Sequence, residues 1–91
     1  MTIKIKDGFV LRKIGASYMA VPFGARANEV KGMISLSESG YLLWKAIQGG
    51  TDTVEGLVEV LRKEYDVPEE IADRDIRAFL DGLLQQGVLA E

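Results

Sequence analysis

The sequence predicts an α+β fold of the winged helix-turn-helix type, in which a three-stranded antiparallel sheet is followed by three helices. Three observations lead to this fold class. Segments rich in β-forming residues occupy the first third of the chain. At Ser37 the spacing of apolar residues changes from every second residue to every third or fourth. Capping residues and glycines then divide the remainder into three amphipathic stretches.

The first two strands form a predicted hairpin. Residues 9–14 are rich in β-branched and apolar side chains, and residues 18–21 repeat that character after a short turn at 15–17. Pro22 follows the second strand and has no N–H to donate to a ladder. We therefore expect the second strand to end near Pro22.

A third strand is predicted over residues 30–36, after a polar connection at 24–29. Its side chains alternate, so one face is expected to be buried and the other exposed. The apolar set is Val30, Ile34 and Leu36, and the other set is Lys31, Met33 and Ser35.

Each of the three helices has recognisable boundaries. Ser37 is a good N-cap for the first, and the glycine pair 49–50 ends it. Asp52 or Thr53 caps the second, and Pro68 begins the third, which Gly87 terminates. The expected buried faces are Gly40, Leu43, Trp44 and Ile47 in the first helix, Val54, Leu57, Val58, Leu61 and Tyr65 in the second, and Ala72, Ile76, Phe79, Leu80 and Leu83 in the third.

Length and composition limit the function. Ninety-one residues, 47% hydrophobic and 27% charged, predict a single soluble domain spanning residues 1–91. The absence of cysteine and histidine removes thiolate chemistry, the commonest metal ligands and the commonest general base. We therefore expect a protein that is not an enzyme and holds no metal or cofactor. No apolar stretch is long enough for a membrane span or a signal peptide, which predicts a cytoplasmic protein without membrane contact.

The charges are unevenly distributed. Residues 1–35 carry six basic and two acidic side chains, whereas residues 36–91 carry five basic and twelve acidic ones. A helix that reads DNA lies among phosphates and needs lysine or arginine, but the second and third predicted helices are acidic. We expect no nucleic-acid partner, and a winged-helix DNA-binding regulator is kept only as an alternative. A structural subunit of an enzyme complex is the other alternative.

The third strand presents a sheet edge to which a peptide could add. An unpaired edge offers N–H and C=O groups, and Gly32 allows a close backbone approach. Ile71, Asp75 and Phe79 follow one border of the buried face of the last helix. This border and the third strand are therefore candidate walls of a groove.

The ordered motifs of the chain resemble the PqqD-like family over nearly its whole length. Members are peptide chaperones, or RiPP recognition elements, which bind the leader of a ribosomally made precursor peptide and present it to a modifying enzyme, often a radical S-adenosylmethionine enzyme. The resemblance implies that the leader adds as a strand beside the third strand and lies against the last helix. The motifs are Phe9-Val10-Leu11-Arg12, Val21-Pro22-x-Gly24, Gly32-Met33-Ile34-x-Leu36-x-Glu38-x-Gly40-x-x-Leu43-Trp44, Glu64-Tyr65-Asp66-Val67, Asp75-Ile76-x-x-Phe79-Leu80-x-x-Leu83 and Gly87-Val88-Leu89.

The resemblance and the edge together predict a set of peptide-binding residues. The strand backbone would supply hydrogen bonds, Ile71 and Phe79 apolar contacts, and Arg74 and Asp75 orientation. The strand residues of this set are Val30, Lys31, Gly32, Met33 and Ile34.

Two features of this chain depart from relatives. Ser37 stands where relatives commonly have asparagine, and it is an equivalent cap. The branch that serves pyrroloquinoline quinone synthesis tends to carry a tryptophan and a Pro-Glu pair in the second strand, whereas this chain has Tyr18 and Pro22-Phe23. The differences indicate a member that serves another modified peptide.

Three points stay open. The sequence does not decide which alternate residues of the third strand face a ligand, although Lys31 and Met33 are favoured because the core does not need their side chains. It does not decide the charge of the leader, although Lys31 on the docking strand favours an acidic or mixed one. A homodimer through the same edge, which would compete with the leader, also stays open.

Overall fold

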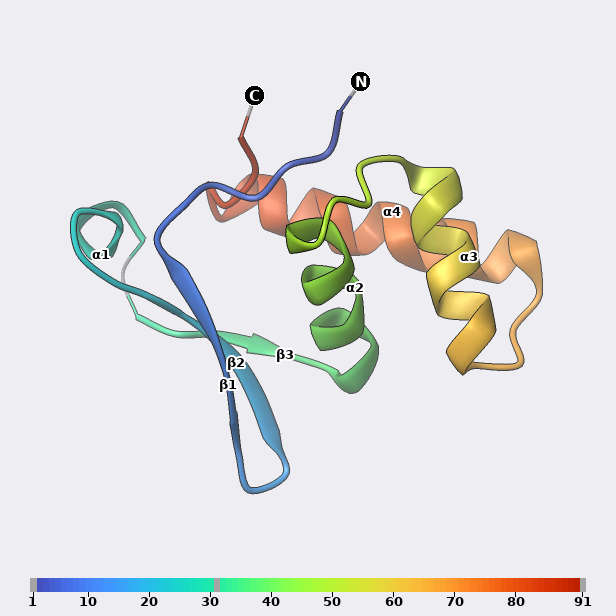
Figure 1. Ribbon diagram of the computed structural model, residues 1–91, viewed down its shortest axis with the longest axis horizontal. Helices are drawn as coiled ribbons and strands as arrows, with labels where there is room; N and C mark the ends of the chain where they lie inside the picture. The colour runs from blue at the N-terminus through green and yellow to red at the C-terminus, as the bar shows by residue number, and fades with distance from the viewer. Residues whose placement is uncertain (1, 31, 91) are drawn as a thin grey trace.

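The computed structural model describes residues 2–30 and 32–90, and it confirms the α+β fold (Figure 1). A three-stranded antiparallel sheet in the order β1-β2-β3 precedes the three long helices of the described chain. The elements are β1 (Phe9–Ile14), β2 (Ser17–Pro22), α1 (Arg26–Glu29), β3 (Ile34–Leu36), α2 (Glu38–Gln48), α3 (Val54–Glu64) and α4 (Glu69–Gln85).

The third strand is shorter than predicted. It spans Ile34–Leu36 instead of residues 30–36, because two local features interrupt the extended backbone before it. Val30 ends the one-turn helix α1, and its N–H donates to the Arg26 carbonyl over 2.9 Å. Gly32 has a φ of +81°, which turns the chain out of a strand conformation. The polar connection at 24–29 contains the one-turn helix α1, which was not predicted from the sequence.

The helix boundaries follow the predicted caps. The Ser37 hydroxyl accepts a hydrogen bond from the Gly40 N–H at 3.0 Å, and Thr53 caps α3 in the same way. Pro68 occupies the N-cap position of α4. Gly87 follows the end of α4 with a φ of +75°, a conformation that glycine adopts without strain.

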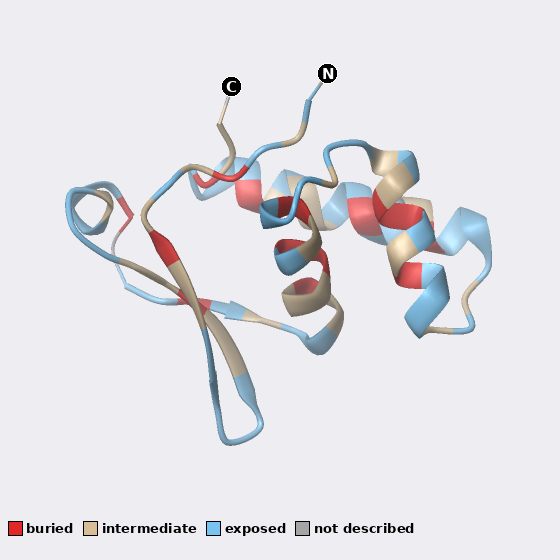
Figure 2. Cartoon of the chain, in the orientation of Figure 1, coloured by how far each residue is buried: buried red, intermediate tan, exposed pale blue. Residues whose placement is uncertain are grey.

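The core lies between the inner face of the sheet and the helices, with α2 at its centre (Figures 1 and 2). The four α2 residues predicted to be buried are all buried. Trp44 is fully buried, and its ring meets Phe9 edge-on with centroids 5.5 Å apart. Such an aromatic pair contributes about 0.5–1.5 kcal/mol beyond the area that it buries. The indole Nε1–H of Trp44 has no hydrogen-bond partner among the residues that the structure describes.

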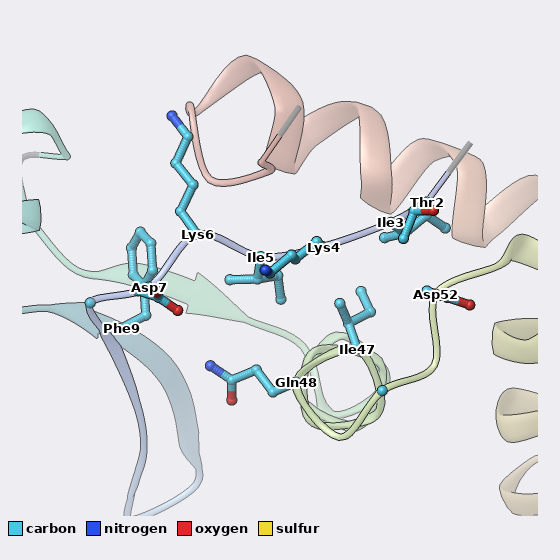
Figure 3. A pocket seen from close by; sticks show the side chains of 12 residues that line it. Thr2, Ile3, Lys4, Ile5, Lys6, Asp7, Phe9, Ile47, Gln48 and Asp52 are labelled. Carbon is cyan, nitrogen blue, oxygen red and sulfur yellow. The ribbon is translucent and has the colours of Figure 1, made fainter.

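The segment before β1 lies against the C-terminal end of the chain. Ile5 bridges to Leu89, and the Ile3 N–H donates to the Asp52 carbonyl over 2.9 Å. A hollow beside this segment is lined by both basic and acidic side chains. Asp7 and Asp52 lie at opposite ends of it, so they do not form a carboxylate pair (Figure 3).

None of the helices in the described part of the chain combines the length and apolarity that crossing a bilayer requires.

Candidate functional site

The hydrogen-bond pattern of the sheet follows from the β1–β2 hairpin. The Phe23 N–H donates to the Gly8 carbonyl over 2.9 Å, just beyond the Phe9–Pro22 end of the ladder. Along antiparallel strands, opposing residues alternate between pairs that are hydrogen-bonded to each other and pairs that are not. Counting along the ladder from the Gly8–Phe23 pair shows that Ile14 and Ser17, at the other end, are a hydrogen-bonded pair. A two-residue turn joins those residues, as expected for a bonded pair. The assignment of hydrogen-bonded and non-hydrogen-bonded pairs in the β1–β2 ladder is therefore consistent at both ends of the hairpin.

The same alternation orients the backbone of β3. Tyr18 and Ala20 are among the β2 residues not bonded to β1, so their N–H and C=O groups point to β3, where they face Leu36 and Ile34. Ser35, between these two, directs its own N–H and C=O away from β2. Because β3 is at the edge of the sheet, these two groups lie at its free edge.

The predicted strand residues therefore divide into different roles. Met33 lies directly before β3 with a side chain that is 62% exposed, and its spacing of two residues from Ser35 is that of strand residues whose backbones face the same edge. Ile34 is buried and bonds toward β2, while Val30 is buried and its N–H is already bonded within α1. Gly32 lies before the strand, and Lys31 lies outside the described residues. The β2–β3 register thus places the backbone groups of Ser35, and not those of Ile34, at the free edge. Met33 belongs to the same set of alternate residues as Ser35.

A groove begins directly after β3, where α2, the end of α3 and the middle of α4 meet. Its apolar lining comes from all three helices and from the segment after α3, while two serines, one tyrosine hydroxyl and two carboxylates provide its polar groups. The lining residues are Ser37, Glu38, Ser39, Gly40, Leu43, Leu61, Tyr65, Val67, Asp75, Ala78 and Phe79.

Gly40 allows α2 and α4 to approach each other at this groove. A Cβ atom on Gly40 would lie 3.2 Å from Cε1 of Phe79, which is tighter than ordinary van der Waals contact. The absence of a side chain therefore lets the Phe79 ring lie against the first turn of α2.

The predicted α4 residues are only partly brought together. Asp75 and Phe79 line the groove, whereas Ile71 and Arg74 do not. Ile71 is 40% exposed, and at 1.5 Å per residue it lies about 12 Å along the helix axis from Phe79. Arg74 is largely exposed, and its Nε approaches the Asp75 carboxylate only to 3.8 Å.

Sequence reasoning missed the contact between Glu38 and Tyr65. The Tyr65 hydroxyl donates to the Glu38 carboxylate over 2.8 Å, connecting the start of α2 to the end of α3. This hydrogen bond is the main cause that raises the pKa of Tyr65, because the carboxylate favours the protonated phenol. The helical spacing of Tyr65 indicated only a core position, and no local pattern connects residues 27 positions apart.

The exposed surface between α3 and α4 is predominantly acidic. Asp73 and Arg77, four residues apart on α4, form an ion pair at 2.9 Å, and its hydrogen bond raises the pKa of Arg77. This surface does not favour the approach of a phosphate backbone. Its lining residues are Glu55, Val58, Glu59, Arg62, Lys63, Glu69, Glu70 and Asp73.

No group of three or more histidine, cysteine, aspartate or glutamate side chains that could hold a metal ion occurs within residues 2–30 and 32–90.

Comparison with known proteins gives one family and one fold relative. The family described as "PqqD: Coenzyme PQQ synthesis protein D (PqqD)" matches residues 27–89. A search of curated proteins finds no match. The solved structure "TbiB1 in Complex with the TbiA(beta) Leader Peptide" has the same fold, with a TM-score of 0.75 and 24% sequence identity over 94% of this chain and 93% of that chain. The family match spans more than half of the sequence, and the chain therefore belongs to the PqqD family.

Proposed function

We propose that this chain is a non-enzymatic binding module that recognises the leader of a ribosomally synthesised precursor peptide and delivers it to a modifying enzyme. The observation that carries the proposal is the free edge of β3, where the N–H and C=O of Ser35 point outward beside a groove. Family membership supports it, as does a fold shared with TbiB1, whose structure contains a leader peptide.

Leader binding would occur by β-augmentation. An added strand would exchange hydrogen bonds with Ser35 and Met33, and its side chains would alternate between two faces. One set would lie on the outer face of the sheet beside the exposed Met33 side chain. The other would lie on the helical side, where a strand that continues past Leu36 reaches the groove with Asp75 and Phe79.

The remaining predicted peptide-binding residues would contact the ends of the bound leader or support the sheet edge from the core. Ile71 and Arg74 would contact a leader that extends along α4 beyond the groove. Lys31 and Gly32 precede Met33, so they would contact the other end of the added strand. The buried Val30 and Ile34 would support the edge from the core and not touch the peptide.

The wider role follows from the same proposal. A single domain spanning residues 1–91 would carry the leader in the cytoplasm, where precursor peptides are made. The partner would be the enzyme that modifies the precursor, with a radical S-adenosylmethionine enzyme as the expected class. A second copy pairing through β3 would block the leader, so sedimentation with and without peptide would detect that competition.

The experiment is a titration monitored by amide chemical shifts. The probes are synthetic peptides that cover the N-terminal halves of the short open reading frames neighbouring this chain's gene. We expect large shifts at Ser35 and Phe79, and small shifts at Glu59 on the opposite surface between α3 and α4. Shifts confined to that surface, or no binding at all, would reject leader binding at β3. The second of these results would favour a structural subunit of an enzyme complex.

A further inference from the structure

We infer that the leader of this protein places a lysine or arginine in the groove after β3, with its apolar stem against Phe79 and its charge beside Glu38 and Asp75. The inference rests on the proposed function and adds the chemistry of one leader residue. A long cationic side chain combines an apolar stem with a charged end, and this is the combination that the groove provides.

The composition of the lining supports a cation. Five apolar side chains line the groove, whereas its charged members are both carboxylates. The apolar members are Leu43, Leu61, Val67, Ala78 and Phe79. An uncharged apolar side chain would gain no attraction from the two exposed carboxylates, and an acidic one would be repelled.

The positions of the carboxylates support the same conclusion. Glu38 is held in place by the Tyr65 hydroxyl at 2.8 Å, and it has no cationic partner among the described residues. Asp75 has only the loose contact with Arg74 at 3.8 Å. Both groups are therefore available to a cation that the peptide brings.

Two features of the site oppose a cation and are weaker. The first turn of α2 contributes the positive end of a helix dipole, equivalent to about half a charge. Two full carboxylate charges outweigh it. Arg74 is 74% exposed at its side chain and does not line the groove, so it can turn into solvent.

The geometry also places this residue within the leader. The groove starts at Ser37, two residues beyond the edge hydrogen bonds of Ser35. At about 3.3 Å per residue, an added strand reaches it two to three residues away from the residue that bonds to Ser35. We therefore expect a basic residue at a constant short spacing from the strand-forming segment of the leader.

The test uses a displayed library of random dodecapeptides selected on the full chain. Selected peptides should share a lysine or arginine at one position beside an alternating apolar segment. One selected peptide is then made in two forms, with the basic residue or with norleucine, and each is titrated against wild type and Asp75→Asn. We expect norleucine to weaken binding about two- to fivefold on wild type and much less on the variant.

Two further variants separate the possible failures. Glu59→Gln, on the opposite acidic surface, is the matched control and should bind both peptides as wild type does. Ser35→Pro should bind both peptides about 5- to 150-fold more weakly than wild type does. If the selected peptides lack a basic residue, or if norleucine weakens binding equally on wild type and Asp75→Asn, the inference is wrong while leader binding stands. If Ser35→Pro binds normally, or if the library yields no binder, the proposed function fails and the inference fails with it.

Discussion

Proline substitutions at two adjacent residues of β3 give the sharpest test of leader binding. Ser35 directs its N–H to the free edge, so Ser35→Pro removes a donor that the sheet does not use. Ile34 is 5% exposed and bonds toward β2, so Ile34→Pro removes a ladder bond and a core side chain together. The two variants should therefore fail in different ways.

The magnitudes follow from these positions. For Ser35→Pro, we expect the free energy of unfolding to fall by less than about 1 kcal/mol, since no ladder bond is lost. A bound leader would keep one unpaired carbonyl, which costs about 1–3 kcal/mol and weakens binding about 5- to 150-fold. For Ile34→Pro, loss of the side chain and one bond should cost about 3–6 kcal/mol, a large part of the stability of a small domain.

Thermal melts and fluorescence anisotropy of a labelled leader peptide measure the two effects separately. Ser35→Ala is the matched control, because it keeps the N–H and should bind as wild type does. A folded Ser35→Pro protein with wild-type affinity would falsify docking on β3. A stable Ile34→Pro protein would show that the assigned alternation of the edge is reversed.

The remaining predictions concern the core, the groove, one turn and metal content. We expect Trp44→Phe to cost less than about 2 kcal/mol in urea unfolding, against about 3–5 kcal/mol for Trp44→Ala, because removing the unpartnered Nε1–H offsets part of the lost packing. In a spectrophotometric titration, Tyr65 should ionise above its ordinary pKa, and Glu38→Ala should lower that pKa. Because the folded-state pKa is raised, the stabilisation is complete below the pKa of a free tyrosine, about 10, and is lost as the pH rises through the folded-state value. Gly87→Ala should lower the free energy of unfolding by about 1 kcal/mol, since alanine is strained at a φ of +75°. Elemental analysis of purified protein should find no stoichiometric metal; one tightly bound ion per chain would contradict the prediction made from the missing cysteine and histidine.

Local signals in the sequence determined most of the fold. Three such signals are the turn between the first two strands, the Ser37 cap and the glycine that follows α4. Each depends only on residues adjacent in the sequence, so its position can be predicted without tertiary information. The buried stripe of α2 follows equally from helical spacing, because the 3.6-residue period places Gly40 and Trp44 on one side. Helices and a tight hairpin are predictable since their hydrogen bonds close within a few residues.

Only the tertiary structure decided the details of the site. Which backbone groups of Ser35 are free depends on its pairing with β2, and this register is a contact between separate segments. The third strand begins later than predicted, because α1 and the turn at Gly32 occupy backbone that the apolar alternation had assigned to the sheet. The groove exists because Glu38, Tyr65 and Phe79 converge from three helices. Such convergence depends on how helices pack against each other, and side chains far apart in the chain carry no shared local pattern from which it could be predicted.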